Sequence, residues 1–311
     1  MATEPGQQPK PTIAMTTAPL IALPAPQILE IAGPDAVAFA QAQFSSNLDE
    51  LADAHWQWSA WLSAQGRVRA FFQLLRDDGH HLRLVLRGGS ATALRDALAR
   101  YVLRAKVTLS VMEPMHAFIE RNATADFGHS ESPNAMRVER DAGRSAMILP
   151  GMPPRRLLLC SGDDVRFETD RSDEARNENA RADIDAGLVT LDAALEDKLL
   201  PTWIGLDALG ATSTRKGCYP GQEIVARLHF KGGNKRWLHR IAFSAKELPS
   251  PGAALGEGSG EHGSIVCSAW TGPATGVALA VLAEQACARM SELSSPALDL
   301  LAIENLTRRT T

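Results

Sequence analysis

One eight-residue segment, Lys216–Glu223, constrains this chain more than any other. It reads Lys-Gly-Cys-Tyr-Pro-Gly-Gln-Glu and places one thiol, Cys218, between a lysine and the expected start of a helix. Its two glycines permit tight turns or a close approach to a ligand, and Pro220 suits the first position of a helix. The run 224–230 is compatible with that helix. A thiol just ahead of a helix and near a lysine is typical of reactive cysteines.

Cys218 has a second interpretation, because free cysteine is among the most buried residue types and can serve as a small apolar side chain in a turn. The other cysteines, at 160, 267 and 287, form no CxxC pair and no metal-type spacing. We therefore expect neither a disulfide framework nor a metal site, and we expect a reducing compartment. A single motif cysteine also cannot supply the four thiolates that usually hold an iron–sulfur cluster.

The composition is that of an ordinary globular protein. Of its residues, 45% are hydrophobic and 22% are charged. Its length of 311 residues is enough for two or three domains. Its net charge of −4 argues against general nucleic-acid or membrane binding, although the segment 227–240 is basic. No apolar run has the length of a membrane helix. Residues 1–26 lack the layout of a signal or transit peptide, so we expect a flexible tail and a cytoplasmic protein. We also expect a monomer.

Strand and helix patterns divide the remainder into two regions. The strand-like runs of the first part are 28–32, 56–62, 68–75, 81–86 and 107–111, with helical runs at 36–44 and 91–103. Their order predicts a ferredoxin-like unit over about residues 27–115. A strand at 155–160 and a helix at 191–199 continue an α+β region that extends over 27–237. Short strand-like runs between turns predict a small β-barrel at 238–311.

The motif and several other segments resemble the YgfZ-type folate-binding proteins, which are relatives of the glycine-cleavage T-protein, an aminomethyltransferase. Residues 216–223 match the family's K-G-C-[FY]-x-G-Q-E at every fixed position. Similar segments also stand at 33–43, 65–68, 101–107, 184–187 and 200–201. The resemblance covers about residues 28–240, and the C-terminal region matches in type only.

The resemblance implies an α+β, T-protein-like fold with three modules around a central opening and a small C-terminal β-barrel. The opening would hold tetrahydrofolate against the motif loop. Asp185 stands where the family's I-E-A-G element has a pterin-binding glutamate, and a carboxylate there accepts two parallel hydrogen bonds from the pterin. The alternative for Asp185 is an aspartate that ends a helix or a turn.

Further residues near the motif have roles implied by the resemblance. Cys218 would be the functional thiol, kept reactive by Lys216. The remaining residues implied to contact folate are Tyr219, Gln222, Glu223, Arg227 and Arg236. Four of these have an alternative: Glu223 can cap the helix, Gln222 can bond to the backbone, and the two arginines can form a solvated basic face.

The implied function is to support the assembly or repair of iron–sulfur clusters in client enzymes, tRNA-modifying enzymes among them. The partners would be a reduced folate and either client enzymes or cluster carriers, with no membrane and no direct nucleic-acid contact. A folate-dependent aminomethyltransferase is one alternative, although 69–71 lacks the adjacent aspartates of the transferases. A cysteine hydrolase or acyltransferase is another, although His229 would stand about 16 Å from the thiol along the helix. RNA binding through 227–240 is disfavoured by the acidic chain.

Overall fold

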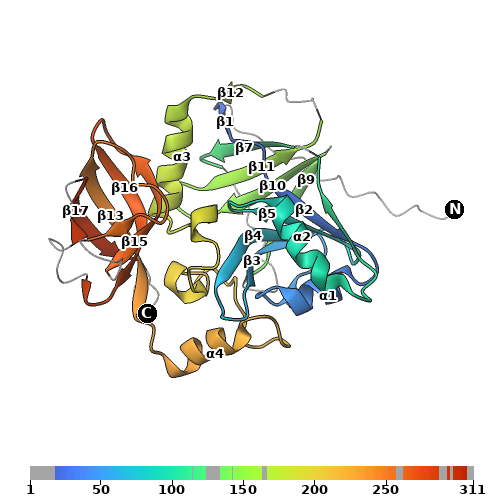
Figure 1. Cartoon of the computed structure of the whole chain (residues 1–311). Coiled ribbons are helices and arrows are strands. Elements are labelled where there is room, and N and C mark those ends of the chain that lie inside the picture. Colours follow the sequence, from blue (N-terminus) through green and yellow to red (C-terminus); the bar gives the residue numbers. More distant parts are fainter. Residues whose placement is uncertain are drawn as a thin grey trace.

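The computed structural model describes residues 18–113, 115–123, 134–141, 143–162, 167–256, 262–286, 293–294 and 297–306. Within these residues, three sheets of six, six and five strands surround the middle of the molecule (Figure 1). The predicted α+β class is confirmed, since helices cover the first two sheets and one of them packs between the second and third (Figure 1). No helix of the described part is long and apolar enough to cross a membrane.

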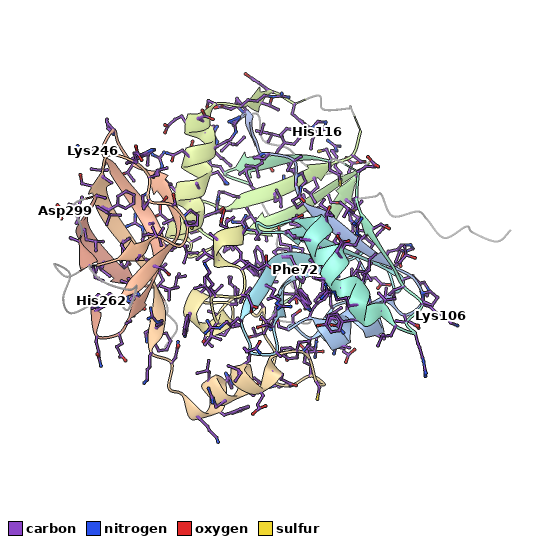
Figure 2. The ribbon with its side chains drawn as sticks, in the orientation of Figure 1. Phe72, Lys106, His116, Lys246, His262 and Asp299 are labelled. Atoms are coloured by element: carbon purple, nitrogen blue, oxygen red, sulfur yellow. The ribbon has the colours of Figure 1, made fainter. Side chains whose placement is uncertain are left out.

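The first sheet contains every strand predicted for the ferredoxin-like unit. Its order is β6 (Thr108–Val111), β2 (Ile28–Ala32), β5 (His81–Leu86), β4 (Val68–Arg76), β3 (His55–Leu62) and β8 (Met136–Arg137). Helices α1 (Ala36–Gln43) and α2 (Ala91–Val102) cover one face and enclose Phe72 (Figure 2). The Ser90 hydroxyl accepts a hydrogen bond from the Ala93 N–H and so fixes the start of α2.

The second sheet includes a strand from the segment predicted as a flexible tail. Its order is β12 (Thr169–Asp170), β1 (Leu20–Ala22), β7 (His116–Arg121), β11 (Arg155–Cys160), β10 (Arg144–Leu149) and β9 (Glu139–Asp141). The tail prediction is wrong at β1, because Leu20 and Ile21 are buried between β7 and β12. Residues 1–17 of that predicted tail lie outside the described residues.

The third sheet is curled into a half-barrel, in line with the small β-barrel expected at 238–311 (Figure 1). Its order is β14 (Ala254–Leu255), β15 (Gly263–Trp270), β16 (Thr275–Ala283), β13 (Arg236–Ala245) and β17 (Leu298–Asn305). Helix α3 (Asp173–Asp185) packs against it, and the Asn177 amide exchanges two 2.8 Å hydrogen bonds with the backbone of Trp270.

The connection between α3 and the third sheet carries the motif. The helix predicted at 191–199 is wrong, since only a short 3-10 turn, η2 (Ala193–Leu195), forms there. The Asp192 carboxylate caps this turn, and Asp197 adopts a positive φ of 57° that redirects the chain. A second 3-10 turn, η3 (Pro201–Ile204), precedes the motif loop. Helix α4 (Gln222–Lys231) then follows at the lower edge of the molecule in Figure 1 and leads into β13.

Candidate ligand cavity and motif loop

A cavity of about 390 Å³ lies where the three sheets meet α3. We refer to it as the central cavity. Its wall comes from β4 and β5 of the first sheet, β7 and β11 of the second, β15 of the third, and the segment 23–27. Most of this wall is apolar, with contributions from Leu23, Val85, Ala117, Leu157, Ile184 and Leu188. Its size and lining are those of a small-molecule site.

Gln73 places an unpaired amide at this cavity. Its side chain is fully buried on β4, and neither its Nε2 nor its Oε1 has a hydrogen-bond partner among the described residues. Burying a polar group without a partner costs about 1–3 kcal/mol. Phe71 and Leu75, which lie on the same face of β4 as Gln73, are apolar and buried, so this strand offers no polar partner next to it. The amide can therefore donate to and accept from a molecule in the cavity.

Asp183 on α3 is the carboxylate at the cavity wall. Its Oδ2 lies 2.8 Å from Nη2 of Arg87, and its Oδ1 lies 2.9 Å from Nη2 of Arg155. Arg155 also donates to the Asn179 side chain at 2.6 Å. Arg87 donates to the Thr190 hydroxyl at 3.3 Å. This group ties α3 to the first two sheets and leaves one edge of Asp183 and Arg87 at the cavity.

The described cysteines differ in their surroundings. Cys267 lies on the wall of the central cavity, and burial raises its pKa to about 11, which keeps the thiol protonated. Burial also raises the pKa of Cys160 within the second sheet. Cys218 is exposed on the motif loop, and all three thiols are free. No group of three histidines, cysteines or acids among the described residues could hold a metal ion.

Lys216 anchors the motif loop to the first sheet. Its buried ammonium donates to the backbone oxygens of Phe44 at 2.6 Å and Ser46 at 2.8 Å. The same ammonium lies 5.2 Å from the centre of the Tyr219 ring. Burial lowers the pKa of Lys216 to about 8. The charge that the sequence places beside Cys218 is thus directed into the protein, toward two carbonyl oxygens.

Two glycines let the loop meet the hairpin between β3 and β4. Gly221 has a φ of 78°, and a Cβ on it would lie 2.5 Å from the Ser63 backbone oxygen. On the other side, a Cβ on Gly66 would lie 2.8 Å from Cβ of Ile224. The two backbones therefore approach more closely than side chains would allow. This contact explains why the motif segment and the turn at 65–68 both need glycine.

The other motif residues have mainly local contacts. Tyr219 is buried, its hydroxyl donates to the Ser213 oxygen at 3.0 Å, and burial raises its pKa. Gln222 donates to the Lys216 carbonyl at 3.4 Å and holds the loop against α4. Glu223 and Arg227 are exposed on α4. None of these residues is among those that line the central cavity, so their predicted folate contacts stay predictions.

The two other predicted ligand residues lie at different places. Asp185 ends α3 at the surface, where its Oδ1 accepts from Nε of Arg240 at 2.6 Å. Asp183 is among the residues that line the cavity and Asp185 is not. The two positions are two residues apart on the helix, which rotates their side chains by about 200° relative to each other. Arg236 begins β13 and lines a second cavity. The assignment of Asp185 to the pterin stays a prediction.

The polar residues of the central cavity were missed from the sequence. Gln73 carries a usable signal, because it is the one polar residue in the apolar run 70–75. Arg87 and Asp183 carry none, since charged residues at a strand end and on a polar helix are ordinary surface features. Their burial follows from the packing of three sheets around α3.

The arrangement of three sheets around a cavity defines a protein with the aminomethyltransferase T fold. The structure is similar to the glycine cleavage system aminomethyltransferase T from Bartonella henselae, with a TM-score of 0.64 over 93% of this chain and 86% of that chain. The sequence identity of 15% makes this a likeness of fold alone. The predicted T-protein-like fold is confirmed.

Sequence relatives are more specific. No family model matches the chain. It is 31% identical over 235 residues to the tRNA-modifying protein YgfZ of Klebsiella pneumoniae, which covers 72% of each chain. It is 30% identical over 243 residues to the tRNA-modifying protein YgfZ of Shigella sonnei, covering 75% of this chain and 74% of that one. The chain belongs to the YgfZ family, as the motif predicted.

Proposed function

We propose that this protein binds a reduced folate, tetrahydrofolate or a derivative, in the central cavity and acts in the cytoplasm in support of tRNA modification. The observation that carries the folate assignment is the buried, unpaired amide of Gln73 at a largely apolar wall. A pterin presents adjacent donors and acceptors on a flat ring, so an amide can pair with its edge while apolar side chains contact its faces. The residues present therefore fit the ligand.

The chain's own residues would hold and orient the folate. Gln73 would pair with the pterin edge, and Val85, Leu157 and Leu188 would contact the ring. Asp183 would accept a hydrogen bond while its charge stays balanced by Arg87. The ligand itself would supply the chemistry of a reduced carrier of one-carbon units.

The role in tRNA modification is drawn from the names of the sequence relatives. We extend it to the assembly or repair of iron–sulfur clusters in client enzymes, with Cys218 as the functional thiol. Supporting this role, Cys218 is exposed on a loop whose position is fixed by Lys216 and Gly221. Such a loop presents the thiol to a client enzyme or a cluster carrier without obstructing the central cavity.

Aminomethyl transfer is the less favoured alternative. At the positions where the resemblance places the adjacent aspartates of the transferases, Ala70 and Phe71 are buried apolar side chains. Arg69 contacts the Trp61 ring and pairs with Asp197 at 3.2 Å. Residues 69–71 therefore offer no carboxylate to a methylene group.

Calorimetric titration with tetrahydrofolate tests the folate assignment. Gln73→Leu should weaken binding at least about tenfold, since it removes two hydrogen bonds and leaves the pterin edge unpaired. Gln285→Leu changes an exposed glutamine in the third module and should bind like the wild type. No saturable binding by folded wild-type protein, or equal binding by Gln73→Leu, would contradict the assignment.

Two further variants test the role of the thiol separately from folate binding. Cys218→Ala should bind tetrahydrofolate normally and fail to restore thiolated tRNA in a bacterial strain that lacks its own YgfZ protein. Asp185→Ala belongs in the same series, because weakened binding there would support the pterin contact predicted from the sequence. Full restoration of thiolated tRNA by Cys218→Ala would remove the thiol from the proposed function.

A further inference from the structure

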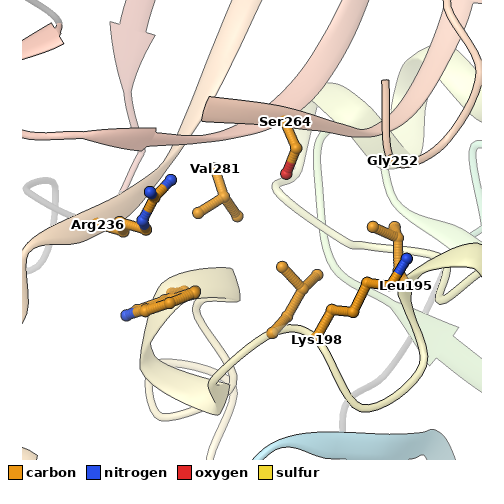
Figure 3. A pocket seen from close by; sticks show the side chains of 8 residues that line it. Leu195, Lys198, Arg236, Gly252, Ser264 and Val281 are labelled. Carbon is orange, nitrogen blue, oxygen red and sulfur yellow. The ribbon is translucent and has the colours of Figure 1, made fainter. Parts of the chain in front are cut away.

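A second cavity, of about 260 Å³, lies between the third sheet and the segment 195–203 (Figure 3). Its floor is apolar and consists of the buried side chains Leu195, Leu199 and Val281. Its size is slightly below the range of about 300–1,000 Å³ that is usual for drug-sized ligands. A small molecule therefore matches it better than a large cofactor.

Two cationic side chains lie at opposite ends of this cavity. Arg236 of β13 and Lys198 flank it, and the Ser264 hydroxyl is directed between them (Figure 3). No aspartate or glutamate is among the described residues that line it.

The guanidinium of Arg236 is held in position by an aromatic ring. It lies 5.6 Å from the centre of the Trp203 ring, and the Arg67 guanidinium lies 5.9 Å from the same ring. Arg67 also donates to the Lys198 carbonyl and so fixes the lysine's backbone. A stacked guanidinium is already oriented, which lowers the entropy lost when it binds a carboxylate or a phosphate.

Two polar side chains close in sequence to the cavity lining have no hydrogen-bond partner among the described residues. η3 and β13 contact each other. Thr202 Oγ1 on η3 and Trp237 Nε1 on β13 are buried without hydrogen-bond partners among the described residues. Native proteins leave few such groups unpaired. These two potential donors, each adjacent in sequence to a residue that lines the cavity, thus have no acceptor among the described residues.

We propose that this second cavity binds a small organic anion, with its carboxylate or phosphate between Arg236, Lys198 and Ser264 and its apolar body against Leu199 and Val281. Charge-assisted hydrogen bonds to the anion would offset the repulsion between the two cations. The site is separate from the central cavity and does not depend on the folate proposal.

Indole N–H resonances provide the test, with the Trp203 signal assigned through Trp203→Phe. Titration with phenyl phosphate and with benzoate should shift this resonance saturably, and the tighter ligand identifies the preferred anion. Inorganic phosphate, which lacks the apolar body, should bind more weakly than phenyl phosphate. Absence of a saturable shift with both aromatic anions would overturn the proposal.

Variants then locate the site. Arg236→Gln should weaken binding at least about tenfold, with circular dichroism confirming that it is folded. Lys198→Gln, at the exposed end, should weaken it about two- to fivefold.

Lys246→Gln is the control: it removes an equally positive side chain from the outer edge of the third sheet (Figure 2) and should bind normally. Equal losses in the Lys198 and Lys246 variants would show a general charge effect and refute the site. Gln73→Leu should also bind normally, so the two proposals can fail separately.

Discussion

Gly217 and Gly221 belong to the same motif but are surrounded differently. Gly221 has a φ of 78° and its Cβ position is blocked by the Ser63 oxygen, whereas nothing lies within 4 Å of the Cβ position of Gly217. Gly221→Ala should lower the free energy of unfolding by about 2–4 kcal/mol, from backbone strain plus the forced separation of loop and hairpin. Gly217→Ala should change it by less than about 0.5 kcal/mol. Urea denaturation measures both, and equal effects would contradict the close backbone contact.

Lys216 links the stability of the protein to pH. The folded chain releases its proton near pH 8, whereas the unfolded chain retains it up to the ordinary value of 10.5. The unfolded state therefore binds more protons in this window, and the free energy of unfolding should rise with pH from about 8. The contribution approaches about 1.4 kcal/mol per pH unit.

Denaturation in urea at pH 7.5, 8.5 and 9.5 measures this contribution. Lys216→Met should remove the rise, while Lys246→Met, at an exposed site, should keep it. Because Lys216→Met also leaves the Phe44 and Ser46 carbonyls unpaired, it should be less stable at every pH. Parallel pH curves for the wild type and Lys216→Met would rule out the proposed proton release.

At the scale of elements, two of the carboxylates on α3 differ in their contribution to stability. Asp183 lies between Arg87 and Arg155, both nearly buried, whereas Asp185 pairs with Arg240 at the surface. Asp183→Asn should lower the free energy of unfolding by about 3–5 kcal/mol, because two buried guanidinium groups lose their counter-charge. Asp185→Asn should cost less than about 1 kcal/mol. Guanidinium chloride would mask such ion pairs, so urea is the appropriate denaturant. Similar losses in both variants would disprove the assignment of faces.

Elements were predictable where local pattern and burial agree. Strands β2 to β6 and the two helices of the first sheet were predicted, since their alternating or helical apolar spacing matches the side that packs, whereas the two-residue edge strand β8 was not. β1 was missed because three residues among prolines carry almost no pattern, and its burial depends on β7 and β12. The helix predicted at 191–199 does not form, because capping by Asp192 and the positive φ of Asp197 outweigh the apolar spacing.

At the scale of the whole molecule, the motif led to the T-protein fold while composition and pattern alone reached only the α+β class. The central cavity was harder to predict from the sequence, since its wall combines residues as distant along the chain as 23 and 268. Gln73 and Asp183 become neighbours of a single space only after three sheets have assembled. Local sequence pattern does not encode such an arrangement.

The central cavity also has a consequence for how long the protein survives. Each of the three sheets contributes to its wall, so any molecule that fills it contacts all modules at once and binds the folded chain only. Occupancy at a hundred times the dissociation constant adds about 2.7 kcal/mol to the free energy of unfolding. Proteases act on the opened chain, so the amount of this protein in a cell should follow the supply of its ligand.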